Sequence, residues 1–157
     1  MPTAMPIEFC RLADLQLADD PINPEWILAG TPTARCAWWS SGTDGIADNY
    51  VWECTAGTFR WFFLCDETVH VISGAVEVEG DGVVPTYLAA GDAALFRAGT
   101  WATWTVQDHV RKHAVIAPRL PGSLRVQLRY GRRAKLVVRR LLGREAAGAS
   151  LTSIGNV

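Results

Sequence analysis

Short runs of apolar and aromatic residues, separated by turn-forming residues, fill the chain from Arg35 to Ala117 and limit its possible folds more than any other feature. The turn residues include Asp44-Gly45, Ser73-Gly74 and Gly91-Asp92, where glycine can supply the positive φ that tight strand connections need. No convincing helical periodicity occurs before residue 120. We therefore expect an all-β barrel or sandwich with strands over residues 35–40, 48–54, 58–64, 68–72, 75–79, 84–88, 93–97, 101–107 and 110–117.

The length of 157 residues fits one domain that can bury a core without disulfides or a structural metal. No apolar run reaches the ~20 residues that cross a bilayer, and the N-terminus lacks the basic start and apolar stretch of a signal peptide. The four cysteines are widely spaced, without a histidine pair beside them, so we expect reduced and mostly buried thiols. These features predict a single-domain cytoplasmic protein.

Period-two alternation sorts the side chains of these strands into two faces. The aromatic residues gather on one face, which we expect to be the interior: Tyr50, Trp52, Phe59, Trp61, Phe63 and Trp104. In the last strand Lys112 falls on the apolar face that also carries Val110, Ala114 and Ile116. The pattern therefore predicts one lysine inside an aromatic barrel, while Trp101 lies on the opposite face.

Residues 55–61, 66–74, 91–92 and 98–99, taken together in this order, resemble the two sequence motifs of the cupin superfamily. The chain is most similar to the small single-barrel branch that groups the ureidoglycine aminohydrolase cupin domain with the ethanolamine-utilization cupins. The features that carry this likeness are Trp-x-Phe at 61–63, Asp-Glu-Thr-Val-His at 66–70, Gly-Asp at 91–92, Trp-Thr-Val at 104–106 and Val-Arg-Lys at 110–112. The resemblance covers roughly residues 19–117 and implies a single-domain RmlC-like jelly-roll barrel that forms a homodimer.

The positions that hold metal ligands in the cupin motifs are occupied here by other residue types. Counted back from Glu67, the two usual histidines of the first motif are replaced by Trp61 and Phe63, and the histidine of the second motif by Ala102. Only the carboxylate of Glu67 remains, whereas a divalent metal needs three or four converging imidazole, thiolate or carboxylate ligands. We therefore expect no bound metal and no other cofactor.

The residues around Glu67 form the candidate site. We expect Trp52, Trp61, Phe63 and Trp104 to line a substrate-binding pocket, because such sites are mostly apolar with a few polar groups. Glu67 and Lys112 are the candidate catalytic groups inside it, since a carboxylate in an apolar pocket suits general acid–base chemistry. His70 is a third candidate through the family resemblance, although alternation turns it away from Glu67 and a surface or interface role is the simpler interpretation.

Two functional hypotheses follow. In the first, the barrel binds or transforms a small amine or amide metabolite without a metal, because tryptophan faces attract cationic amines. In the second, the aromatic residues fill the barrel and Glu67 and Lys112 neutralise each other as a buried pair. The protein is then a non-catalytic scaffold or interaction module whose basic C-terminal extension docks on a partner or membrane surface. The sequence leaves open whether the protein is an enzyme, and an empty cavity beside Glu67 would favour the first hypothesis.

The charge is divided unevenly along the chain. Residues 1–110 carry 4 basic and 15 acidic side chains, whereas residues 111–157 carry 11 basic and 1 acidic side chain. We expect an N-terminal arm (1–34), the barrel (35–117), a basic amphipathic helical extension (118–147) and a disordered tail (148–157). The extension is expected to dock on the acidic barrel or a protein partner, with a membrane surface as the second choice and nucleic acid as the least favoured.

Overall fold

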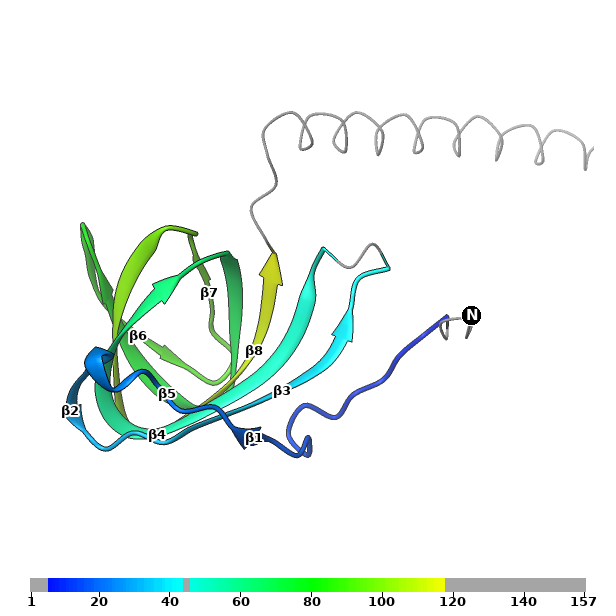
Figure 1. Ribbon diagram of the computed structural model, residues 1–157, viewed down its shortest axis with the longest axis horizontal. Coiled ribbons are helices and arrows are strands. Elements are labelled where there is room, and N and C mark those ends of the chain that lie inside the picture. Colours follow the sequence, from blue (N-terminus) through cyan, green and yellow to red (C-terminus); the bar gives the residue numbers. More distant parts are fainter. Residues whose placement is uncertain (1–5, 44–45, 118–157) are drawn as a thin grey trace, which may run out of the picture. The chain divides into compact units, whose positions relative to one another are not determined.

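The computed structural model describes residues 6–43 and 46–117 (Figure 1). The all-β fold is confirmed, with one short 3₁₀ helix in the lead-in to the barrel. The elements are β1 (Ala18–Asp19), η1 (Pro24–Trp26), β2 (Ile27–Gly30), β3 (Ala34–Ser41), β4 (Asp48–Phe63), β5 (Asp66–Gly80), β6 (Val83–Ala89), β7 (Ala93–Phe96) and β8 (Thr100–Ala117). Among the described residues, no helix is long and apolar enough to cross a membrane. The expected extension (118–147) and tail (148–157) lie outside the described residues.

All the strands belong to one antiparallel sheet (Figure 1). The three long strands β4, β5 and β8 bend, so that the sheet folds over on itself. Strand β8 pairs with both β4 and β5 along most of its length. The first half of β4 pairs with β3 and its second half with β2, while the first half of β5 pairs with β7 and its second half with β6. Each long strand therefore contributes to both layers of a jelly-roll barrel.

The long strands correct the predicted strand boundaries. The predicted pairs 48–54 with 58–64, 68–72 with 75–79, and 101–107 with 110–117 are each one continuous strand. The pairing shifts register inside these strands, and a β-bulge inserts an extra residue that moves the alternation to the other face. The interruption in the sequence pattern therefore resembles a turn, although the chain continues as a strand.

Gly74 is the clearest example, because the turn predicted at Ser73-Gly74 is wrong. Gly74 lies inside β5 with a φ of +70°, and it pairs with Val110 of β8 next to the register shift. A Cβ atom built on Gly74 would lie 2.0 Å from the carbonyl oxygen of His109. Only glycine allows the two backbones to approach this closely, so the residue that indicated a turn in the sequence is needed for a bulge.

The predicted interior face is confirmed. Trp52, Phe59, Phe63 and Trp104 are buried in the core, together with Val76 and Val78 on the second half of β5. Trp101 lies on the outer face, where the guanidinium of Arg60 sits 4.6 Å from its ring centroid. The alternation of the sequence therefore identifies the inner face of each half-strand correctly, although not the number of strands.

Two arginines on the outside of the barrel hold the lead-in segment in place. Arg111 donates hydrogen bonds to the carbonyl oxygens of Leu12 and Leu15 and to the carboxylate of Glu53, at 2.7–3.2 Å. Arg35 donates at 2.6 Å to the carbonyl oxygen of Leu17. Hydrogen bonds from a charged donor are stronger than neutral ones, so residues 12–17 follow a fixed path that leads into β1 at the barrel edge.

Candidate functional site

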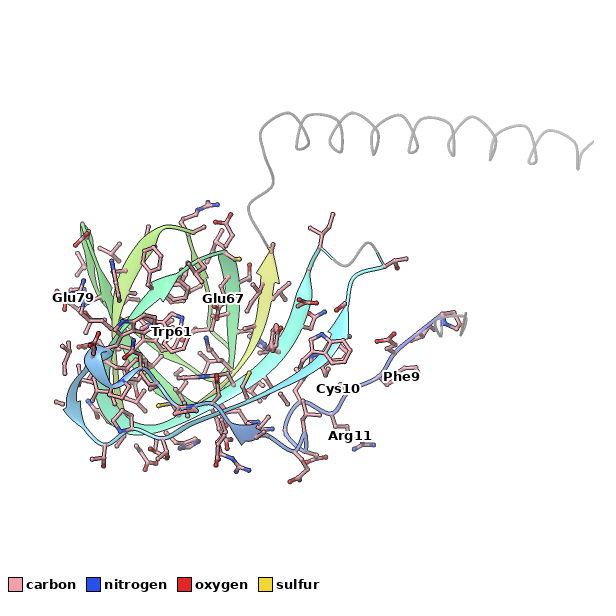
Figure 2. All side chains as sticks on the ribbon, viewed as in Figure 1. Phe9, Cys10, Arg11, Trp61, Glu67 and Glu79 are labelled. Carbon is pink, nitrogen blue, oxygen red and sulfur yellow. The ribbon has the colours of Figure 1, made fainter. Side chains whose placement is uncertain are left out.

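A cavity of about 450 Å³ opens into the barrel between the lead-in segment and the strands. The side chains of Trp61 and Glu67 both reach it, and both lie within the barrel in Figure 2. Its volume falls in the usual range for small-molecule sites. The lining residues are Asp19, Asp20, Cys36, Ala37, Trp38, Tyr50, Trp52, Phe59, Trp61, Glu67, Trp104, Lys112, Ala114 and Ile116.

A buried ion pair lies in the wall of this cavity. The Nζ atom of Lys112 donates to Oε1 of Glu67 at 2.6 Å, and both side chains are about one-tenth exposed or less. Lys112 comes from β8 and Glu67 from the start of β5, and alternation turns both to the interior, as predicted. The second hypothesis anticipated this pair, but the pair lines an open cavity and not a filled barrel.

Two tryptophans surround the ammonium group of Lys112. Its Nζ atom lies 4.9 Å from the ring centroid of Trp52 and 4.7 Å from that of Trp104, within the range of cation–π attraction. The Trp52 ring meets Trp61 and Trp104 edge to face, at 6.0 and 6.1 Å between ring centroids. The Trp104 ring also stacks on Phe59 at 6.3 Å. These contacts fix the ring positions, so the site stabilises a cation at one defined point.

Trp26 extends the aromatic network to the barrel exterior. Its ring contacts Trp61 at 5.6 Å and Trp101 at 5.3 Å, edge to face in both cases. Trp26 belongs to η1. Asn23 caps the N-terminus of this helix, because its side chain accepts a hydrogen bond from the backbone N–H of Glu25. The lead-in segment thus supports one wall of the cavity from outside.

Two of the predicted site residues lie away from the cavity. Phe63 is buried, but its ring stacks on Phe96 at 4.5 Å and it does not line the cavity. His70 is exposed on the outer face of β5, where its register partner in β8 is His113. The other predicted residues, Trp52, Trp61, Trp104, Glu67 and Lys112, all line the cavity.

Sequence reasoning missed several polar residues at the cavity. Asp19 and Asp20 reach it because Ala18 and Asp19 pair with Cys36 and Arg35, and nothing in the sequence of the lead-in segment indicated that pairing. Tyr50 was predicted to lie on the inner face but was not assigned to the site, and Cys36 could have been found in the same way from the alternation of β3. The charged residues of the lining are therefore three carboxylates and one ammonium.

Burial and the neighbouring carboxylates change the chemistry of Cys36. Burial is the main cause and the charge of Asp20 the second, and together they raise the pKa of the Cys36 thiol from 9.0 to about 11. Because the thiolate is the reactive form, Cys36 is a weak nucleophile near neutral pH. The cavity thus disfavours a new negative charge at this position.

Cys36 should therefore be alkylated slowly. We expect iodoacetamide at pH 8 to react with Cys36 about 100-fold more slowly than with a thiol of ordinary pKa, because the raised pKa lowers the thiolate fraction by that factor. The raised pKa also stabilises the fold below pH 9, and this contribution is lost as the pH rises towards 11. Peptide-resolved mass spectrometry gives the rate, with Cys10 of the same sample as the control. If Cys36 were alkylated as fast as Cys10, or if its alkylation rate stopped rising near pH 9, the raised pKa of Cys36 would be contradicted.

The cavity does not fit the metal that cupin-type motifs usually hold. Trp61 occupies one of the expected ligand positions, and the carboxylate of Glu67 is neutralised by Lys112 at 2.6 Å. Among residues 6–43 and 46–117, no three His, Cys, Asp or Glu side chains gather closely enough to hold a metal ion. The donor set of this cavity is suited to organic ligands and not to a divalent cation.

Residues 41–114 match the family model of the EutQ-like cupin domain. Among solved structures, the EutQ protein of Clostridium difficile superposes with a TM-score of 0.54 at 18% identity, over 69% of this chain and 84% of that one. A protein of unknown function from Pseudomonas syringae pv. tomato gives a TM-score of 0.60 at 20% identity, over 66% of this chain and 45% of that one. No curated protein matches the sequence.

At these identities the likeness to solved structures shows the fold, and the family model shows the EutQ-like character of residues 41–114. The finer likeness to the ureidoglycine aminohydrolase domain and the homodimer stay predictions. Residues 41–114 are therefore a cupin domain similar to the EutQ-like branch, as the sequence motifs predicted.

Proposed function

We propose that the cavity binds a small metabolite that carries a protonated amine, and that it does so without a metal. The observation that carries this proposal is the lining, in which aromatic faces surround three carboxylates and a single ammonium group. The Lys112 ammonium neutralises Glu67, and the Arg35 guanidinium lies 3.8 Å from the Asp19 carboxylate, so Asp20 supplies the excess negative charge of the cavity. Negative potential and aromatic faces both favour a cation over a neutral or anionic ligand.

Different parts of the lining would bind the charge and the carbon skeleton of the ligand. Asp19 and Asp20 belong to the lead-in segment, where they are exposed and can attract an approaching cation. Trp61, Trp38 and Tyr50 offer ring surface for the organic part of the ligand, and Trp61 is held by Trp26 and Trp52. An amine is thus recognised by its charge at the lead-in segment and by its carbon skeleton on the barrel wall.

Charge should decide which ligands bind. We expect small primary amines to raise the thermal midpoint and to give saturable heats in calorimetry, while the alcohols of the same carbon skeleton bind more weakly. Asp20→Asn should weaken amine binding about fivefold, the ~1 kcal/mol of an exposed charge pair, and leave alcohol binding unchanged. Asp81→Asn, in the exposed turn between β5 and β6, removes the same charge away from the cavity and should have no effect.

Equal affinity for the amine and its alcohol would overturn the proposal. A panel of amines and amides in which none stabilises the protein would favour the alternative, in which the barrel is a non-catalytic scaffold.

A further inference from the structure

Lys112 is a nucleophile by residue type, and binding of an amine does not use it. The chain contains two lysines, Lys112 and Lys135, and only Lys112 lies among the described residues. Its side chain is 8% exposed and lines the cavity. A lysine is expensive to bury, because its charged group loses hydration and its flexible stem loses conformational freedom. A buried lysine that lines a cavity is therefore a candidate for chemistry.

A lysine amine attacks carbonyl compounds when a neighbouring group accepts its proton. Oε1 of Glu67 is 2.6 Å from Nζ, within the distance for direct proton transfer. Glu67 is itself 10% exposed and has no other hydrogen-bond partner assigned to its side chain among the described residues. The cavity thus contains an amine, a proton acceptor in contact with it, and room for a small molecule beside both.

We propose that Lys112 forms an imine with a small aldehyde or ketone that enters this cavity, with Glu67 as the proton-transfer group. Nζ passes a proton to Glu67 and attacks the carbonyl carbon, so that a C–N bond forms and the carbonyl π bond breaks. A second proton then moves from Nζ to the former carbonyl oxygen, which becomes a hydroxyl group. Glu67 returns the proton to that hydroxyl, the C–O bond breaks, and one water molecule leaves. No oxidant, reductant or cofactor is required, and hydrolysis reverses the same steps.

The surroundings of Nζ favour the product of this condensation. The protonated imine keeps a positive charge on the same nitrogen, which lies between the rings of Trp52 and Trp104 and beside the carboxylate of Glu67. The contacts that now stabilise the ammonium would therefore stabilise the iminium ion as well. Phe59, Ala114 and Ile116 add apolar surface for the carbon skeleton of the carbonyl compound.

The inference shares the cavity of the proposed function but does not depend on an ammonium ligand, so the two can fail separately. If the carbonyl compound also carries an amine, Asp19 and Asp20 would bind that second group.

Reductive trapping tests the proposal with an internal standard in the same chain. The full-length protein is incubated at pH 7 with propionaldehyde and sodium cyanoborohydride, and alkylation is measured at Lys112, Lys135 and the N-terminus by peptide mass spectrometry. We expect Lys112 to be propylated at least about tenfold faster than Lys135, a modest part of the ~10²–10⁴-fold contribution of a positioned acid–base group. In urea this preference should disappear.

Two variants separate chemistry from accessibility. Lys112→Arg keeps the positive charge beside Glu67 but cannot form an imine, so total labelling should fall to that of the remaining amines. Glu67→Gln removes the proton acceptor and should slow labelling at Lys112 at least about tenfold relative to Lys135. Labelling of Lys112 no faster than Lys135 in the folded protein would overturn the proposal, as would an unchanged rate in folded Glu67→Gln. If either result were found and the protein still bound amines, the imine proposal would be wrong and the proposed function would stand.

Discussion

Replacing one member of the Lys112–Glu67 pair should destabilise the fold by about 3–5 kcal/mol, and replacing both should cost much less than the sum of the two single effects. Lys112→Met leaves the Glu67 carboxylate buried without a partner, and Glu67→Gln leaves the ammonium without its counter-charge. The double variant removes both charges from the interior, so the desolvation cost of the pair disappears together with its attraction. Urea unfolding of the four proteins gives the coupling free energy directly.

An exposed pair on the same barrel provides the control. Arg97 and Asp66 lie 3.9 Å apart, with side chains 69% and 41% exposed, and exposed pairs contribute about 1 kcal/mol or less. Asp66 also accepts a hydrogen bond from the backbone of Ala98, so Arg97→Gln is the cleaner single change. Strictly additive effects at Lys112 and Glu67 would show that water reaches the pair and screens it, and would contradict the burial on which the site depends.

The buried pair stabilises the fold, and the imine proposal gives it a chemical role as well. The two sequence hypotheses treated these roles as alternatives. Alternation predicted that Glu67 and Lys112 share the interior, and the structure brings Nζ and Oε1 into contact. It also leaves a cavity of about 450 Å³ beside them. The aromatic side chains leave this part of the barrel open, because the Phe63 ring stacks on Phe96 and does not line the cavity.

Period two allowed the inner faces to be predicted because side-chain direction in a strand depends only on neighbouring residues. The carboxylates of Asp19 and Asp20 could not be found in this way, since their position depends on β1 pairing with β3 and on hydrogen bonds from Arg35 and Arg111. These are contacts between residues far apart in the chain, and they leave no periodic signal. The sequence therefore predicted the aromatic wall of the candidate cation site, but it did not predict the acidic residues of the lead-in segment.

Gly74→Ala should destabilise the protein by about 4 kcal/mol or more. The need for glycine at this position also depends on a contact between distant parts of the chain, which the sequence pattern does not reveal. Alanine at a φ of +70° costs about 1–2 kcal/mol by itself. The added Cβ would also lie 2.0 Å from the His109 carbonyl oxygen and 2.8 Å from its carbon, both of them backbone atoms. Relief requires β5 and β8 to separate beside the register positions that pair Val71 with Lys112. Ligand binding in the cavity should therefore fall together with stability.

Gly82→Ala is the matched control for Gly74→Ala, because it separates the cost of the dihedral angle from the cost of the contact. Gly82 has a φ of +72°, almost equal to that of Gly74, but a Cβ built there meets nothing within 4 Å. We expect Gly82→Ala to cost about 1–2 kcal/mol and to leave the cavity unchanged. The difference between the two variants in urea unfolding measures the close approach of β5 and β8 alone. Equal losses would mean that the bulge can open without cost, and the geometry of Lys112 would then not depend on Gly74.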